Sequence, residues 1–298
     1  MLCFYWIYTQ FSNSFGVWYR RRVYVLLMLT PHKENVTIVQ NMTDTDVSAL
    51  DAVFSDVNEL ATGCQAVDLS RKADLSLVSI ATRQHCYLFD ILHCTLRDPM
   101  VHFLRKLLED ASKTKIIHDC RMDSDALEHI CKIKLVNIHD TSCFHTVLTG
   151  RNEISLNNLL AHHKIEVNAV RNGDVYKENH AFWAERPLTD RMIEWASNDV
   201  LKLFEVYDLQ KQLAVDTGKM PACLEMCEKY RTFDLNCRVK EIKVNNVKRF
   251  IGKQGSKINA LRTRTNTGIY PRGVRNENKY VVYYTDDKSL KQVESAAR

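Results

Sequence analysis

Residues 115–127 read Lys-Ile-Ile-His-Asp-Cys-Arg-Met-Asp-Ser-Asp-Ala-Leu, and this stretch decides the fold. Its beginning, Lys115 to His118, has the pattern of a short buried strand, and a helix is predicted to follow from Met122 to Cys131. A strand that leads into a helix is typical of a layered α/β sheet. Asp123 stands at the start of this helix, where the helix dipole favours a carboxylate.

The segments on both sides of this stretch also alternate between strands and helices. Before it, the pattern predicts strands at 36–40, 75–80 and 86–91, and helices at 45–60 and 98–111. The N-cap of the first helix is expected at Asp44 or Thr45. After it come a strand at 137–140, helices at 141–148 and 155–162, and one long helix at 189–215. Roughly 180 residues of mixed α/β pattern are expected to form one domain.

Residues 238–298 have a second, separate pattern. A strand at 239–244 precedes a short helix, a Gly-x-x-Gly turn at Gly252–Gly255 and a helix at 256–265. Strands at 269–272 and 279–285 and a final helix from 288 complete a small α+β unit. This unit contains 15 Lys and Arg against 5 Asp and Glu, whereas residues 36–237 contain 22 against 30. A basic tail behind an acidic body indicates that the tail meets a polyanion.

The overall composition excludes several classes of protein. A hydrophobic share of 45% and a charged share of 26% among 298 residues are those of a globular chain. Residues 1–35 contain no apolar stretch of the roughly 18 residues that a membrane helix needs, so no membrane association is expected. We treat them as an extension without an assigned role. Its three arginines leave a mitochondrial presequence open beside a cytoplasmic or nuclear location.

The cysteines and histidines show no motif of known chemistry. None of the ten cysteines forms a Cys-x-x-Cys pair, which favours a reduced intracellular protein. Cys223 and Cys227, four residues apart, are interpreted as buried neutral thiols. His162 and His163 are interpreted as a polar helix end, and His118 as a hydrogen-bonded core histidine.

The C-terminal unit resembles a type I KH domain along its sixty-odd residues, from the strand through Gly252–Gly255 to the last helix. The resemblance implies a loop that clamps about four nucleotides while an apolar groove holds the bases. Two glycines allow close approach of a sugar-phosphate chain, and amides at the next helix start form a positive cradle. The predicted nucleic-acid-binding residues are Arg249, Gly252, Lys253, Gln254, Gly255 and Lys257.

The body resembles the DEDD superfamily of 3′–5′ exonucleases, in its RNase D-like and Egalitarian-like branch. The resemblance covers about Val36 to Leu213 and rests on residues 75–81, 115–127, 140–141, 182–189 and 196–200. It implies a ribonuclease H-like mixed sheet with flanking helices. It also implies two Mg²⁺ or Mn²⁺ ions held by four carboxylates, which activate a water and stabilise the leaving oxygen.

Two of the four acids are present in this sequence. The resemblance places the third acid of the family at Asp123 and the fourth at Asp199. Both are predicted to be retained acids at the catalytic positions and weak metal ligands at most.

The other positions of the motif are substituted. Gly63 and Gln65 stand where the family has Asp-x-Glu, and Trp195 stands four residues before Asp199 in place of the water-positioning tyrosine. A rival alignment puts Asp68 at the first acid but leaves Ser70 at the glutamate. Glutamine is a poor ligand for a hard dication, and an indole N–H cannot accept a proton. We therefore expect a degenerate site in which Asp123 and Asp199 hold at most one ion loosely, and not a two-ion site.

These observations predict an intracellular RNA-binding protein in four parts: an extension at 1–35, an exonuclease-like domain at 36–215, a helical connector at 216–237 and a KH domain at 238–298. In the preferred interpretation, the chain is a pseudo-nuclease that acts as an RNA adaptor or scaffold with protein partners. The alternative is an active exoribonuclease that uses Mg²⁺ or Mn²⁺ and captures substrate with its KH domain. A third interpretation is binding to single-stranded DNA.

Overall fold

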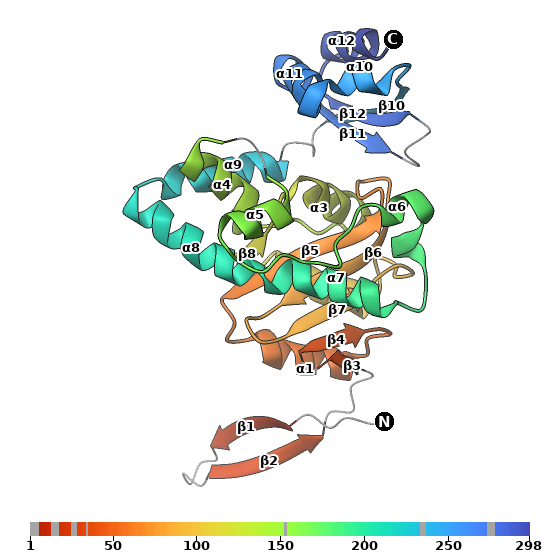
Figure 1. Cartoon of the computed structure of the whole chain (residues 1–298). Helices are drawn as coiled ribbons and strands as arrows, with labels where there is room; N and C mark the ends of the chain where they lie inside the picture. The colour runs from red at the N-terminus through yellow and green to blue at the C-terminus, as the bar shows by residue number, and fades with distance from the viewer. Residues whose placement is uncertain are drawn as a thin grey trace.

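A seven-stranded mixed sheet forms the centre of the body, in the strand order β3-β4-β7-β6-β5-β8-β9 (Figure 1). The computed structural model describes residues 6–12, 18–24, 29–33, 35–151, 154–232, 237–272 and 278–298. The strands are β3 (Leu29–Lys33), β4 (Val36–Val39), β5 (Glu59–Val67), β6 (Asp74–Ala81), β7 (Cys86–Asp90), β8 (Thr114–Ile117) and β9 (Ile138–Asp140). β5 and β6 form an antiparallel hairpin, and β8 runs parallel to β5. The predicted mixed α/β fold is confirmed.

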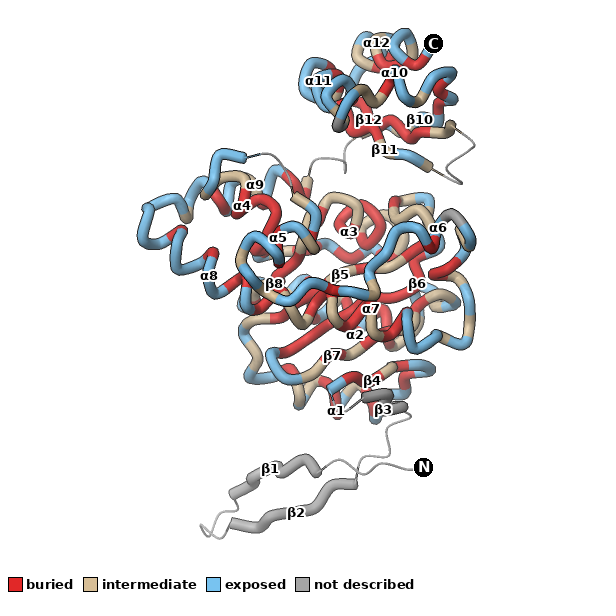
Figure 2. Tube along the Cα trace, in the orientation of Figure 1, coloured by how far each residue is buried: buried red, intermediate tan, exposed pale blue. Residues whose placement is uncertain are grey.

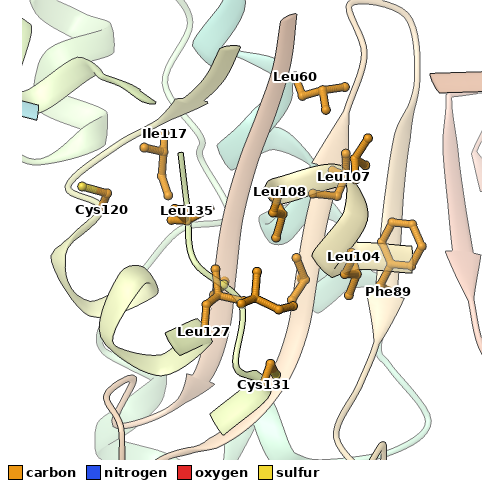
Figure 3. Close-up of a cluster of buried hydrophobic side chains, with 14 of the residues drawn as sticks. Leu60, Phe89, Leu104, Leu107, Leu108, Ile117, Cys120, Leu127, Cys131 and Leu135 are labelled. Atoms are coloured by element: carbon orange, nitrogen blue, oxygen red, sulfur yellow. The ribbon is translucent and has the colours of Figure 1, made fainter. Parts of the chain in front are cut away.

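Helices cover both faces of this sheet. They are α1 (Asp44–Phe54), α2 (Pro99–Leu108), α3 (Arg121–Ala126), α4 (Thr141–Thr149), α5 (Leu156–His162), α6 (Val175–Glu178), α7 (Asp190–Leu201), α8 (Leu203–Asp216) and α9 (Met220–Thr232). One hydrophobic cluster joins the sheet to α1, α2, α3 and α9, and a second joins it to α5, α7 and the first half of α8. Figure 3 shows part of the first cluster, where Leu104 and Leu108 of α2 lie near Phe89 and Leu127.

Part of residues 1–35, which we treat as an extension, forms β-strands. β3 pairs with β4 at the edge of the main sheet. β1 (Trp6–Ser12) and β2 (Trp18–Tyr24) pair as a separate antiparallel hairpin. The rest of residues 1–34 lies outside the described residues.

Two predicted helices differ from those in the structure. The predicted helix 45–60 ends at Phe54, and β5 begins at Glu59. The carbonyls of Phe54 and Val57 accept hydrogen bonds from the Lys113 ammonium at 2.9 and 2.8 Å, which satisfies them outside a helix. The N-cap of α1 is Thr43, which forms a capping box with Asp46. The predicted helix 189–215 is two helices, α7 and α8, separated at Lys202. Apolar residues follow a helical pattern on both sides of Lys202, so the sequence pattern predicts one continuous helix and not a break at this residue.

The C-terminal unit has the predicted order of elements. Its sheet has the order β10-β12-β11, with β10 (Arg238–Lys243), β11 (Gly268–Arg272) and β12 (Lys279–Tyr284) all antiparallel. α10 (Val247–Ile251), α11 (Ser256–Thr265) and α12 (Asp287–Ala297) pack on one face around a hydrophobic cluster of their own. Figure 2 shows this buried layer between the helices and the sheet. Residues 233–236 and 273–277 lie outside the described residues.

A buried carboxylate joins the C-terminal unit to the body. Asp125 of α3 is completely buried and accepts a hydrogen bond from the Tyr283 hydroxyl of β12 at 3.0 Å. Arg71 donates to the same carboxylate from its backbone nitrogen at 2.7 Å and from Nε at 2.9 Å. Its guanidinium also lies over the Tyr283 ring and donates to the Cys237 carbonyl. Two residues from distant parts of the chain, Arg71 and Tyr283, therefore meet at Asp125.

Within the described residues, no helix is both long enough and apolar enough to cross a membrane. The nine cysteines in this part of the chain are free thiols. Cys223 and Cys227 are buried, as predicted, and burial raises the pKa of Cys223 to about 11.

Candidate functional site

A cleft of about 420 Å³ brings together the residues of the predicted motif. Gly63 and Gln65 of β5, Asp123 of α3 and Asp199 of α7 all line it. The two β5 residues share one side of the strand because side chains alternate along it. A Cβ atom added to Gly63 would lie 3.7 Å from Val200 Cγ1, so this position has ordinary space for a side chain.

Asp68, the rival first acid, lies outside this cleft. It follows the last residue of β5, and its carboxylate is 3.3 Å from Nε2 of His180. The structure therefore favours the alignment that places Gly63 and Gln65 at the substituted positions.

Asp123 is buried and accepts a short hydrogen bond. Its Oδ1 lies 2.6 Å from the backbone nitrogen of Cys64, so it is held against β5. Burial is the largest influence on its pKa, and the nearby charge of Asp119 acts in the same direction. Together they raise the pKa of Asp123 to about 7, although the Cys64 amide opposes them. A carboxyl group with this pKa carries only part of a negative charge at neutral pH.

Asp199 is enclosed by hydrogen-bond donors. The indole Nε1 of Trp195 donates to Oδ2 at 3.1 Å, as expected for residues one helical turn apart. Gln65 Nε2 is at the limit of a hydrogen bond, 3.5 Å from the same oxygen. Asn168 Nδ2 donates to Oδ1 at 2.8 Å. Burial raises the pKa of Asp199, and the Arg171 charge opposes this.

Arg171 forms an ion pair with Asp199 inside the cleft. Its Nη1 contacts Asp199 Oδ2, and its guanidinium carbon lies 5.8 Å from the centre of the Trp195 ring. Sequence reasoning missed both Arg171 and Asn168. Each lies in an irregular segment between α5 and α6, where no periodic pattern indicates which way a side chain faces.

The remaining acid of the cleft is also paired. Asp119 has φ of 57°, and its carboxylate is bound by Arg121, whose Nε lies 2.6 Å from Oδ1. His118 beside it uses both ring nitrogens, toward Thr141 Oγ1 and the Ile154 carbonyl, which confirms a hydrogen-bonded core histidine. Of the three acids that line the cleft, two are therefore neutralised by arginines.

These residues do not fit a site for two divalent ions. Such a site needs several carboxylate oxygens that are free to bind hard cations. Here Gly63 supplies no ligand, Gln65 supplies a neutral amide, and Arg171 places a fixed positive charge against Asp199.

A second candidate site is the turn between α10 and α11. Gly252 and Gly255 have φ of 75° and 78°, in the region that favours glycine. A Cβ on Gly252 would lie 2.8 Å from Lys257 Cγ and 3.0 Å from Lys257 N, so this residue must be glycine. Lys253, Lys257 and Arg249 are exposed around the turn. The side chain of Gln254 lies outside the described residues.

Residues 60–214, about half of the chain, match the family described as 3′–5′ exonuclease. The chain belongs to the 3′–5′ exonuclease family. This confirms the family expected from residues 115–127 and 196–200. The matched segment contains Gly63, Gln65, Asp123 and Asp199, so these residues of the cleft belong to the part of the chain that matches the family.

Known members and solved structures agree with this assignment. The piRNA biogenesis protein EXD1 of Xenopus laevis is 31% identical over 158 residues, which cover 48% of this chain and 35% of that protein. Escherichia coli RNase D, an exoribonuclease, superposes with a TM-score of 0.55 at 22% identity, over 66% of this chain and 50% of that one. Brucella melitensis NrnC with bound Mg²⁺ superposes with a TM-score of 0.50 at 20% identity, over 59% of this chain and 83% of that one. The chain thus spans about a third of its curated relative.

Proposed function

We propose that this chain is a non-cleaving member of the exonuclease family that binds single-stranded RNA. The observation that carries the proposal is the ion pair between Arg171 and Asp199 in the cleft, opposite a glycine at position 63. In a metal-dependent nuclease, the cleft concentrates negative charge that divalent ions neutralise. In this chain a guanidinium neutralises the retained acid instead.

The cleft is suited to hold an RNA strand without hydrolysing it. The Arg171 side chain lines the cleft and is 39% exposed, so its outer N–H groups can reach a phosphate. Asp123, with a pKa raised to about 7, adds little repulsion toward a polyanion. The name of the relative, piRNA biogenesis protein EXD1, supports a role with small RNA. On this basis, residues 36–215 act as an adaptor body for RNA and for protein partners.

In the same proposal, residues 238–298 are a KH domain that supplies most of the affinity. This proposal is supported by the order of elements, by the two glycines with positive φ, and by the charge of the unit, which has 15 basic and 5 acidic residues. α11 begins directly after Gly255, so its first amides point toward the turn. RNA is favoured over DNA because the relative named above acts in an RNA pathway.

A nuclease time course on 5′-labelled single-stranded RNA tests the loss of cleavage. The full chain is incubated with Mg²⁺ and then with Mn²⁺, beside an Asp123→Asn, Asp199→Asn double variant. We expect no shortening of the 3′ end with either protein. A ladder that the double variant lacks would overturn the proposal and establish an active exoribonuclease.

RNA binding is measured separately, by fluorescence anisotropy. The variant Lys253→Asp, Gln254→Asp adds negative charge at the turn. A matched control places the same two changes on α12, at Lys291 and Gln292. Because a hydrogen bond to a charged group contributes about 1.5–3 kcal/mol, we expect the first variant to bind at least about tenfold more weakly than the wild type. Equal affinity of the two variants would refute the role of the turn.

The binding should also depend strongly on salt. For single strands, the logarithm of the binding constant falls with the logarithm of salt by about 0.7 for each phosphate contact. The turn variant should show a smaller slope than the wild-type chain. A parallel titration with DNA of the same sequence decides whether the 2′-hydroxyl contributes.

A further inference from the structure

Three histidines meet where the end of α5 packs near α4. His145 lies on α4, His162 is the last residue of α5, and His163 is the residue that caps this helix. One ring nitrogen from each histidine lies within 4.8 Å of the other two. The rings of His145 and His162 are 5.1 Å apart at 86°, and those of His162 and His163 are 5.0 Å apart at 81°. Neighbouring rings are therefore nearly perpendicular and do not stack.

Two of the nitrogens in this cluster are buried without a partner. His145 is 2% exposed, and neither its Nδ1 nor Nε2 of His163 has a hydrogen-bond partner among the described residues. Burying a polar atom without such a partner costs free energy, so nearly all buried polar atoms in proteins are satisfied. Two unsatisfied imidazole nitrogens that share one small space indicate a ligand that both can bind.

The chemistry of the cluster favours a metal ion as that ligand. An imidazole has a lone pair on one of its ring nitrogens, and this lone pair binds metals. His145 Nδ1 and His163 Nε2 are the two nitrogens without a partner, and the cluster brings one nitrogen of each of three histidines together.

We propose that His145, His162 and His163 bind one Zn²⁺ ion, with the fourth position taken by water. Zinc binds imidazole nitrogens at about 2.0–2.1 Å and accepts three protein ligands with one open position. A ligand set made only of imidazoles does not suit Mg²⁺ or Ca²⁺, which require oxygen. His162 is exposed, so the fourth position faces solvent.

The backbone allows two neighbouring histidines to bind the same ion. His162 has helical geometry, but His163 has φ of −88° and ψ of 4°, outside the helix. The rings of His162 and His163 nevertheless lie with their centres 5.0 Å apart, so both can face the same point. Small rotations of the three rings would bring the nitrogens from within 4.8 Å to the closer spacing of a tetrahedral site.

The proposed ion has a structural role. It joins the middle of α4 to the end of α5, across a connection that includes the undescribed residues 152–153. The opposite end of α5 lies at the cleft, which Ser155 and Leu156 line. Zinc therefore fixes one wall of the cleft without contacting it.

A zinc titration of the full chain, freed of metal by a chelator, tests this proposal. Calorimetry and native mass spectrometry measure affinity and stoichiometry, and we expect one Zn²⁺ per chain and a higher unfolding temperature with zinc. His162→Gln changes an exposed residue and so leaves folding intact, and His145→Gln is a second variant. Even changes around a zinc ligand weaken binding by about 10- to 100-fold, so we expect at least that loss.

Two controls separate this site from others. His93→Gln changes an exposed histidine elsewhere and should bind zinc like the wild type, as should the Asp123→Asn, Asp199→Asn variant of the cleft. Replacing zinc by Co²⁺ should give the visible absorption of a tetrahedral site without the sulfur-to-metal band of a cysteine site. Equal zinc affinity of His162→Gln and the wild type, no bound zinc, or a sulfur-to-metal band would each overturn the proposal.

Discussion

Replacing Arg171 by methionine removes the positive charge from the cleft and keeps most of the side-chain stem. Asp199, whose side chain is 9% exposed, then keeps only uncharged donors from Asn168, Trp195 and Gln65. Removing one partner of a buried ion pair costs about 3–5 kcal/mol, whereas exposed pairs contribute about 0–1 kcal/mol. Because the Arg171 side chain is 39% exposed and screened by water, we expect a destabilisation of about 1–2 kcal/mol.

A double-mutant cycle measures this ion pair directly. Urea unfolding at pH 8, followed by tryptophan fluorescence, is recorded for Arg171→Met, Asp199→Asn and the double variant. The double variant should be less destabilised than the sum of the two single variants, by about 1 kcal/mol or more. Independent sites add within about 0.3–0.5 kcal/mol. A coupling inside that range would refute the argument that the guanidinium replaces a metal ion.

The destabilisation caused by Arg171→Met should depend on pH. Burial raises the pKa of Asp199, and Arg171 opposes this, so its removal raises that pKa further. The unpaired carboxylate can then take up a proton more readily as the pH falls. Arg171→Met should therefore be less destabilising at pH 5 than at pH 8.

Three further changes test other parts of the structure. The pKa of Asp123 is raised from 3.8 to about 7, so its contribution to stability should be present below pH 4 and lost as the pH rises to about 7. Asp123→Asn should remove this part of the pH dependence of the unfolding free energy, which amounts to up to about 4 kcal/mol and is measured by urea unfolding. If the pH dependence of the variant equals that of the wild type, the carboxyl is already ionised at pH 5. Gly63→Asp combined with Gln65→Glu should create divalent-ion binding that calorimetry detects with Mn²⁺, because position 63 has space for a side chain. If this variant folds and binds no Mn²⁺, the missing acids do not explain the loss of the site. Lys115 is completely buried, and its ammonium donates to the carbonyls of Asp110 and Lys113 at 2.5 and 2.6 Å. Lys115→Met should therefore lower the free energy of unfolding by about 1–3 kcal/mol. A loss under about 0.5 kcal/mol would contradict a stabilising role for these hydrogen bonds.

Local patterns in the sequence predicted most elements of the fold. The strand at 115–118 and the helix at 256–265 have strong signals, an apolar run in the first case and two glycines in the second. The turn at Lys202 had none, because buried residues continue on both sides of it. Such a turn depends on packing against other helices, which periodicity does not report.

The candidate site was predictable only where the sequence positions are linked by regular structure. Trp195 and Asp199 are one helical turn apart, so their contact followed from spacing alone. Arg171 reaches Asp199 from an irregular segment, and its place depends on the whole fold. The histidine cluster was not predictable for the same reason: His162 and His163 form a candidate metal site only together with His145, which lies on another helix.

The position of Asp125 has a mechanical consequence. α3 is six residues long, and it holds Asp123 against the cleft on one side and Asp125 against Tyr283 on the other. A force on the C-terminal unit therefore acts on the same short helix that shapes the cleft. Because this helix contacts both parts, a displacement of one is transmitted to the other over two residues.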